Sequence, residues 1–219
     1  MTQRHQFDAH LEELRGAIIQ MGEMVEQAII SAVKSLKESD LELAQQVIKN
    51  DEDINHLEES IDDIGSTLIA TQQPVAKDLR KILIAFKISN DLERIADMAV
   101  DIAKVTLRIG KQELIKPLVD IPRISEIVLE MVDQGIRAYM EENVDLAYKM
   151  AKMDDEVDHL YSQILHELFA YMVEDPRKMT QVLLLSFVSR YLERMADHAT
   201  NIGESVVYLV KGKRPDLNQ

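Results

Sequence analysis

The chain has 219 residues, of which 46% are hydrophobic, so it can bury a sizeable core and is not a disordered polypeptide. Its formal net charge of -14 disfavours nucleic acid and anionic membranes as main partners, and favours cations or a basic face on another protein. Cysteine is absent from the sequence, which excludes disulfides and thiolate metal sites and fits a reducing compartment.

Hydrophobic spacing predicts six long helices in segments rich in good helix formers. In the first segment, Leu11, Leu14 and Ile18 recur at intervals of three and four residues. In the second, Ile54 and Ile61 lie on one such apolar face. Prolines fall between these segments or near their ends, where they do not interrupt a helix. The predicted helices are 7–38, 41–72, 75–110, 121–141, 143–173 and 176–211.

The sequence also contains an internal repeat. Residues 92–102 match residues 192–202 at seven of eleven positions, at an offset of 100. Residues 49–57 align with residues 152–160 at an offset of 103. Two correspondences at nearly one offset predict an all-α fold of two tandem antiparallel three-helix bundles, a spectrin-like pseudo-repeat. The predicted domains are 1–112 and 118–219, and residues 110–123 form the joint.

The third and sixth predicted helices begin with segments that are apolar on every side, at 82–86 and 182–185. A helix that is apolar all round is expected to be buried all round. These two helices are therefore predicted to be central and to pack the two bundles together. The chain shows neither a signal peptide nor an apolar run near the roughly 18 residues of a membrane span, so a cytoplasmic protein is expected.

The later half of the third predicted helix carries an acidic ridge. Its members Glu93, Asp97 and Asp101 recur every four residues and cover about 80° of the helix surface. The sixth helix repeats this ridge with Glu193, Asp197 and Asn201. The second helix of each unit adds a polar stripe, formed by Asp51, Asn55, Glu58 and Asp62 in the first unit and by Asp154 and Asp158 in the second.

These ridges are open to two interpretations. Like charges four residues apart destabilise a helix by a few tenths of a kcal/mol, and a bound cation removes that penalty. Carboxylate clusters suit Mg, Ca and Mn, and also Fe and Zn when histidine helps. Acidic pairs at this spacing are also common on solvated helix faces, so the ridges alone do not decide between a metal site and a plain surface.

Two carboxylate-x-x-His elements, Asp53 with His56 and Glu156 with His159, resemble parts of a di-iron bundle. Such a site needs two Glu-x-x-His helices and two further Glu helices around one core, whereas here the two elements fall in separate units. A di-metal carboxylate enzyme is therefore the alternative function. His198 is expected to be a surface or packing residue rather than a metal ligand.

Several segments of the chain resemble those of a known family. The paired Leu-Glu-Arg-Ile/Met-Ala-Asp segments that begin at Leu92 and Leu192 are similar to those of PhoU phosphate-uptake regulators. The segments 24–27, 73–80 and 208–212 carry the same resemblance, which covers nearly the whole chain. It implies a pair of three-helix bundles and a protein that is not an enzyme.

The resemblance further implies a negative regulator of the phosphate regulon and of phosphate uptake. Its implied partners are the ATPase subunit of the phosphate ABC transporter and the sensor histidine kinase of the regulon, so that contact with the membrane is made only through partners. A homodimer is expected because exposed apolar residues on a two-bundle body often support dimers. A bare adaptor, whose acidic ridges dock basic surfaces without metal, is a third hypothesis.

The family's E/D-x-x-x-D motifs can hold multinuclear metal clusters, with one motif from each of two helices. Carried over residue by residue, the implied ligands are Glu93, Asp97 and Asp101, then Glu193, Asp197 and Asn201, with Asp51, Asn55, Asp154 and Asp158 on the facing helices. The implied metal is Fe, Zn, Mn or Mg. Because Asn55 and Asn201 stand in place of acids, each site lacks one charge. Tyr161 and Leu165 stand where the first unit has Glu58 and Asp62, so the two sites are expected to differ in affinity and nuclearity.

Overall fold

The computed structural model describes residues 3–213 and residue 217. The helices are α1 (Gln3–Glu38), α2 (Leu41–Gln72), α3 (Lys77–Ile109), α4 (Asp120–Glu141), α5 (Val144–Ala151), α6 (Asp154–Glu174), the short 3-10 helix η1 (Pro176–Lys178) and α7 (Met179–Lys211). The described residues contain no β-strand, so the predicted all-α class is confirmed. No helix among them is both long and apolar enough to cross a membrane.

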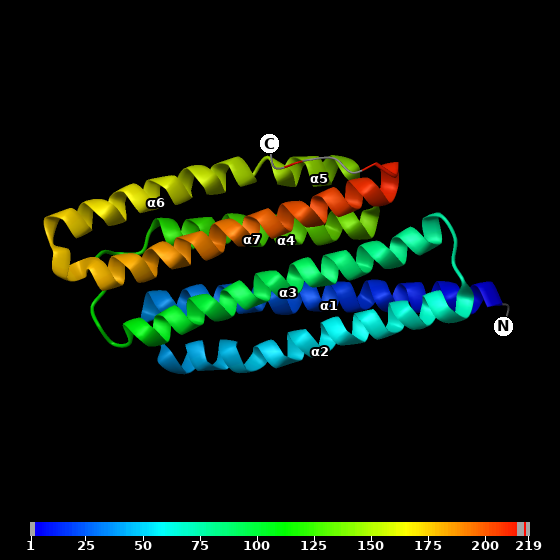
Figure 1. The fold of residues 1–219 in the computed structure, drawn as a ribbon, viewed down its shortest axis with the longest axis horizontal. Coiled ribbons are helices and arrows are strands. Elements are labelled where there is room, and N and C mark those ends of the chain that lie inside the picture. Colours follow the sequence, from blue (N-terminus) through cyan, green and yellow to red (C-terminus); the bar gives the residue numbers. More distant parts are fainter. Residues whose placement is uncertain (1–2, 214–216, 218–219) are drawn as a thin grey trace.

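The helices form two bundles that lie side by side (Figure 1). In the first, α1, α2 and α3 each contact the other two, and in the second, α7 lies against α4, α5 and α6. The most extensive helix–helix contact joins α3 to α7, which run antiparallel through the middle of the molecule (Figure 1). The predicted central position of these two helices is confirmed, while the domain limits 1–112 and 118–219 remain a prediction.

The segment expected to form one helix at 143–173 forms two. α5 ends at Ala151 and α6 begins at Asp154, after a two-residue turn. Acidic residues fill the first turn of α6, where they interact favourably with the helix dipole. The break was missed because Met150 and Val157, which are both buried, keep helical spacing across it. Apolar periodicity therefore does not reveal this turn.

Helix starts also differ slightly from the prediction. α1 already begins at Gln3. α3 begins at Lys77 rather than residue 75, because Ala76 has a positive φ of 49° that lies outside the helical region. The last long segment opens with η1, in which the Arg177 backbone N–H donates a hydrogen bond to the Asp175 side chain, before α7 begins.

The apolar starts of α3 and α7 are not buried on every side, so that prediction was wrong. Ile82 and Leu185 are fully buried, but Leu83 is 49% exposed and Leu183 is 52% exposed. Phe187 continues the exposed side of α7. The reason is geometric, because the helices that α7 contacts leave part of its circumference open, and Leu183 and Phe187 lie on that open part.

Candidate functional site: two carboxylate clusters

The first acidic cluster lies where α2 packs on α3, and consists of Asp51, Asn55, Glu93, Asp97 and Asp101. The Asn55 amide donates a 3.4 Å hydrogen bond to Asp51 Oδ2. Burial, followed by repulsion from Asp97 on the facing helix, raises the pKa of Asp51. Burial and Asp97 likewise raise the pKa of Glu93. The structure therefore brings the predicted ridge of α3 against the predicted stripe of α2.

The second acidic cluster lies at the corresponding place between α6 and α7, and consists of Asp154, Asp158, Glu193 and Asp197. Burial, then Asp197, Asp158 and Glu193, raise the pKa of Asp154 to about 7. Burial also raises the pKa of Glu193 and of Asp197. Asp154 is thus held close to three other carboxylates, and at neutral pH it carries only part of its negative charge.

Cationic side chains offset part of this repulsion. Arg94 lies 3.3 Å from Glu93 and 3.1 Å from Asp97. Lys104 forms a 2.9 Å ion pair with Asp101. In the second cluster the corresponding contact comes from Arg190, whose Nη1 donates a 2.5 Å hydrogen bond to Glu193. These contacts give Arg94 and Arg190 the role of holding cluster carboxylates in place.

The donor chemistry of both clusters suits a cation. Asp51 Oδ1 and Glu193 Oε2 are buried and accept no hydrogen bond, and the buried Glu93 Oε2 accepts none but lies 3.3 Å from Arg94 Nε. Carboxylate oxygens of this kind are the ligands that hard divalent ions prefer. As the side chains stand, no group of three or more His, Asp or Glu among the described residues is arranged to hold a metal ion. Ligation therefore requires these side chains to reorient.

Asn201 is engaged away from the second cluster. Its amide donates a 3.4 Å hydrogen bond to Asp91 Oδ1 on α3, and His198 Nδ1 lies 3.0 Å from the same oxygen. Asp91 is 6% exposed, and its other carboxylate oxygen accepts no hydrogen bond. This polar contact ties α7 to α3, and it gives His198 the packing role that the sequence favoured.

Sequence reasoning missed Asp91, although a signal for it was present. Ile84, Ile88, Ile95 and Met98 are buried at helical spacing along α3, and residue 91 falls on the same line. An acid at a position that the periodicity assigns to the core needs a polar partner. Pattern reading alone could have flagged Asp91, but not His198 as its partner.

The carboxylate-x-x-His elements do not meet. His56 lies on α2 and His159 on α6, and these two helices make no contact with each other. Both histidines are exposed. His56 instead lies beside Glu52 and Glu59 of its own helix. The described helices thus do not bring the two elements of the expected di-iron pattern around one core.

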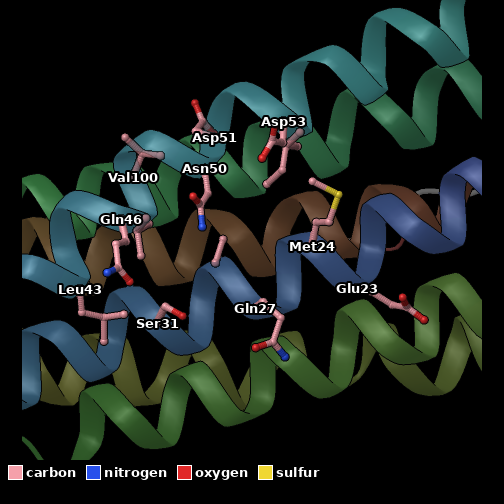
Figure 2. Close-up of a pocket in the computed structure, with 13 residues that line it drawn as sticks. Glu23, Met24, Gln27, Ser31, Leu43, Gln46, Asn50, Asp51, Asp53 and Val100 are labelled. Atoms are coloured by element: carbon pink, nitrogen blue, oxygen red, sulfur yellow. The ribbon is translucent and has the colours of Figure 1, made fainter.

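A cleft of about 370 Å³ opens between α1 and α2 beside the first cluster (Figure 2). Its polar lining includes the carboxylates of Glu23, Asp51 and Asp53 and the amides of Gln27 and Asn50. Among the described residues that line it, none is basic. No sequence motif marked this cleft, because its walls combine ordinary surface positions of two helices.

Two three-helix bundles that pack through their last helices, with acidic clusters at corresponding places, define a class of tandem helical-bundle protein. The PhoU domain model matches this chain twice, at residues 18–106 and 121–206. The crystal structure of PhoU from Pseudomonas aeruginosa superposes with a TM-score of 0.90 at 39% identity, over 94% of this chain and 100% of that one. The phosphate transport system regulatory protein PhoU from Streptococcus pneumoniae superposes with a TM-score of 0.89 at 27% identity, over 96% and 99%.

Relatives agree in sequence as well. The phosphate-specific transport system accessory protein PhoU homolog of Clostridium acetobutylicum is 41% identical over 97% of both chains. The accessory protein PhoU of Escherichia coli is 35% identical over 95% of this chain and 86% of its own length. The chain therefore belongs to the PhoU family.

Proposed function

We propose that this chain is an accessory regulator of phosphate uptake. It contacts the ATPase subunit of the phosphate ABC transporter and the sensor histidine kinase of the phosphate regulon. Through these contacts it restrains uptake and keeps the kinase from signalling when phosphate is plentiful. We further propose that it acts in the cytoplasm, as a homodimer, and by binding rather than by catalysis.

One observation carries this proposal: the family model matches both bundles, and relatives that are named as phosphate-specific transport system accessory proteins align over nearly the whole chain. Such end-to-end similarity supports a shared role better than a match to one bundle would. The net charge of -14 also supports a role in contacts with proteins or cations rather than with nucleic acid.

Deletion of the gene tests the regulatory role. Phosphate-responsive promoters should become active in high phosphate, and a plasmid copy of the gene should restore repression. If those promoters stayed repressed in the deletion strain, the proposal would fail. Copurification of the chain with the ATPase subunit and with the kinase tests the two partners separately.

We also propose that the two acidic clusters bind divalent or transition metal ions. The buried carboxylate oxygens that accept no hydrogen bond support this, because a cation would satisfy them and relieve the repulsion. Asp51, Glu93 and Asp97 would hold the ion in the first cluster, and Asp154, Glu193 and Asp197 in the second. The chemistry that the ion supplies is neutralisation of charge, which alters the surface presented to a partner.

Metal content after exhaustive dialysis tests this second proposal. The wild type should retain Fe, Zn or Mn, and the Glu193→Ala/Asp197→Ala variant should retain roughly half as much. The matched variant Glu93→Ala/Asp97→Ala should lose the other part. Retention of no metal by the wild type, also after loading with each ion, would contradict the proposal and leave the adaptor role standing without metal.

A further inference from the structure

Six apolar side chains follow the hairpin of α6 and α7 from its middle to its closed end. They recur every four residues on each helix, and we name them the outer apolar face: Leu165, Phe169 and Val173 on α6, and Met179, Leu183 and Phe187 on α7. All except the partly covered Leu165 are exposed, and Val173 reaches 79% exposure. None of these six side chains belongs to the buried hydrophobic core.

The two rows lie side by side. The guanidinium of Arg190 stacks over the Tyr161 ring at 5.9 Å, which fixes the register of the antiparallel pair. Counting from this contact toward the loop, Leu165 lies within one residue of the level of Phe187, and Phe169 within one residue of the level of Leu183. The face extends about 12 Å from Leu165 to Val173, at 1.5 Å per helical residue.

In the opposite direction along the same pair of helices, the surface becomes acidic. Beyond Tyr161 the facing residues are Asp158 with Glu193 and then Asp154 with Asp197, which form the second acidic cluster. The outer surface of the α6–α7 pair is therefore apolar at the closed end of the hairpin and anionic at the other end. A complementary ligand needs an apolar face that ends in positive charge.

The first bundle provides an internal comparison, because the repeat places polar residues at several of the same positions. Where the second bundle has Phe169 and Phe187, the first has Ser66 and Lys87. Both of these are exposed as well. The corresponding surfaces are thus equally open to solvent, but only the second is aromatic, so the apolar character is not a requirement of the bundle itself.

We propose that the outer apolar face, together with the second acidic cluster, is the surface that docks an amphipathic helix of a partner protein. That helix carries Leu, Met or Phe side chains along one face and Lys or Arg at one end. The inference rests on the proposed adaptor function and assigns it a surface. A second copy of this chain is a poorer occupant of this particular face, because its second acidic cluster would lie against the first, so the proposed homodimer would pair through a different surface.

The test gives the second bundle the residues that the first bundle has at the matched positions. The purified ATPase subunit and the purified cytoplasmic part of the kinase serve as probes against metal-free chain. The probe that the wild type binds should bind the Phe169→Ser/Phe187→Lys variant at least about tenfold more weakly, because exposed aromatic anchors dominate such contacts. The matched control, Ser66→Ala/Lys87→Ala, should bind as the wild type does. Circular dichroism and the melting temperature establish that both variants fold.

Two further measurements identify the occupant. Partner binding should slow amide exchange along the outer apolar face, and affinity should fall as salt rises, because the basic end is screened. Unchanged affinity of the Phe169→Ser/Phe187→Lys variant would overturn the assignment of the outer apolar face as the docking surface. So would light scattering that shows a wild-type dimer and a monomeric variant, which would assign the face to a second copy. If the wild type bound neither probe, the adaptor function would fail and this surface with it.

Discussion

At the scale of single residues, Asp154 shows the electrostatic repulsion between carboxylates within the clusters. Burial of its carboxyl group, followed by repulsion from neighbouring carboxylates, raises its pKa from an ordinary 3.8 to about 7. The folded chain therefore binds this proton more tightly than the unfolded chain does. Stability from this group is complete below pH 4 and is lost as the pH rises toward 7.

The Asp154→Asn variant removes this cost. In metal-free buffer at pH 8 it should raise the free energy of unfolding by about 1 kcal/mol, a value reduced for solvent screening because the group is partly exposed. At pH 4, where the native carboxyl is already protonated, it should change little. Urea unfolding at both pH values checks this. The exposed Asp63→Asn serves as control, and an equal gain at both pH values would contradict the explanation.

At the scale of helices, apolar spacing and the repeat were enough to predict the class, the number of bundles and the central pair. Apolar spacing failed as a predictor where two different structures produce the same spacing. Apolar spacing runs unbroken through the turn between α5 and α6, and it cannot distinguish a helix side that meets another helix from one that meets solvent. Leu183 is exposed for the second reason. The ridges were predictable because four-residue spacing fixes a face, whereas the cleft beside Asp51 depends on how two helices approach.

The approach of α2 to α3 depends on Gly65. A Cβ atom at this position would clash with the Phe86 ring and lie 2.9 Å from Ile82 Cγ2. We expect Gly65→Ala to lower the free energy of unfolding by about 1–3 kcal/mol, despite the better helix propensity of alanine. Gly16 on α1 has no neighbour within 4 Å, so Gly16→Ala should raise it by about 0.5–1 kcal/mol. Urea unfolding should show changes of opposite sign in the free energy of unfolding for the two variants. A decrease for both variants would refute this explanation.

At the scale of the whole molecule, several contacts tie the two bundles together beside the central helices. Lys77 and Lys81 on α3 both pair with Glu142 at the end of α4, at 2.8 and 3.0 Å. The hydrogen bond from Lys77 is the main cause that lowers the pKa of Glu142. Arg80 donates a hydrogen bond to the Leu209 carbonyl. These contacts predict that the bundles unfold together rather than in sequence.

A wedge between the bundles tests this coupling. Gly22 on α1 is buried against Ile136 on α4, and no larger side chain fits there without displacing it. Gly22→Leu should lower the free energy of unfolding by about 1–3 kcal/mol and broaden or split the calorimetric transition. Gly16→Leu, on the same helix but exposed, should leave the shape of the transition unchanged. A sharp, unshifted transition for Gly22→Leu would show that the bundles are not coupled here.

The crossing of α3 and α7 has a further consequence. Asp91 meets Asn201 on one side of it. On the other side their repeat counterparts Tyr191 and Asp101 lie close together, and burial followed by the nearby Asp101 carboxylate raises the pKa of Tyr191. Equivalent residues therefore meet from both directions, as they do when two identical subunits pair about a twofold axis. The chain therefore has the geometry of a homodimer whose two subunits are joined in one polypeptide. The connection between α3 and α4 makes that pairing intramolecular, so the association no longer depends on protein concentration.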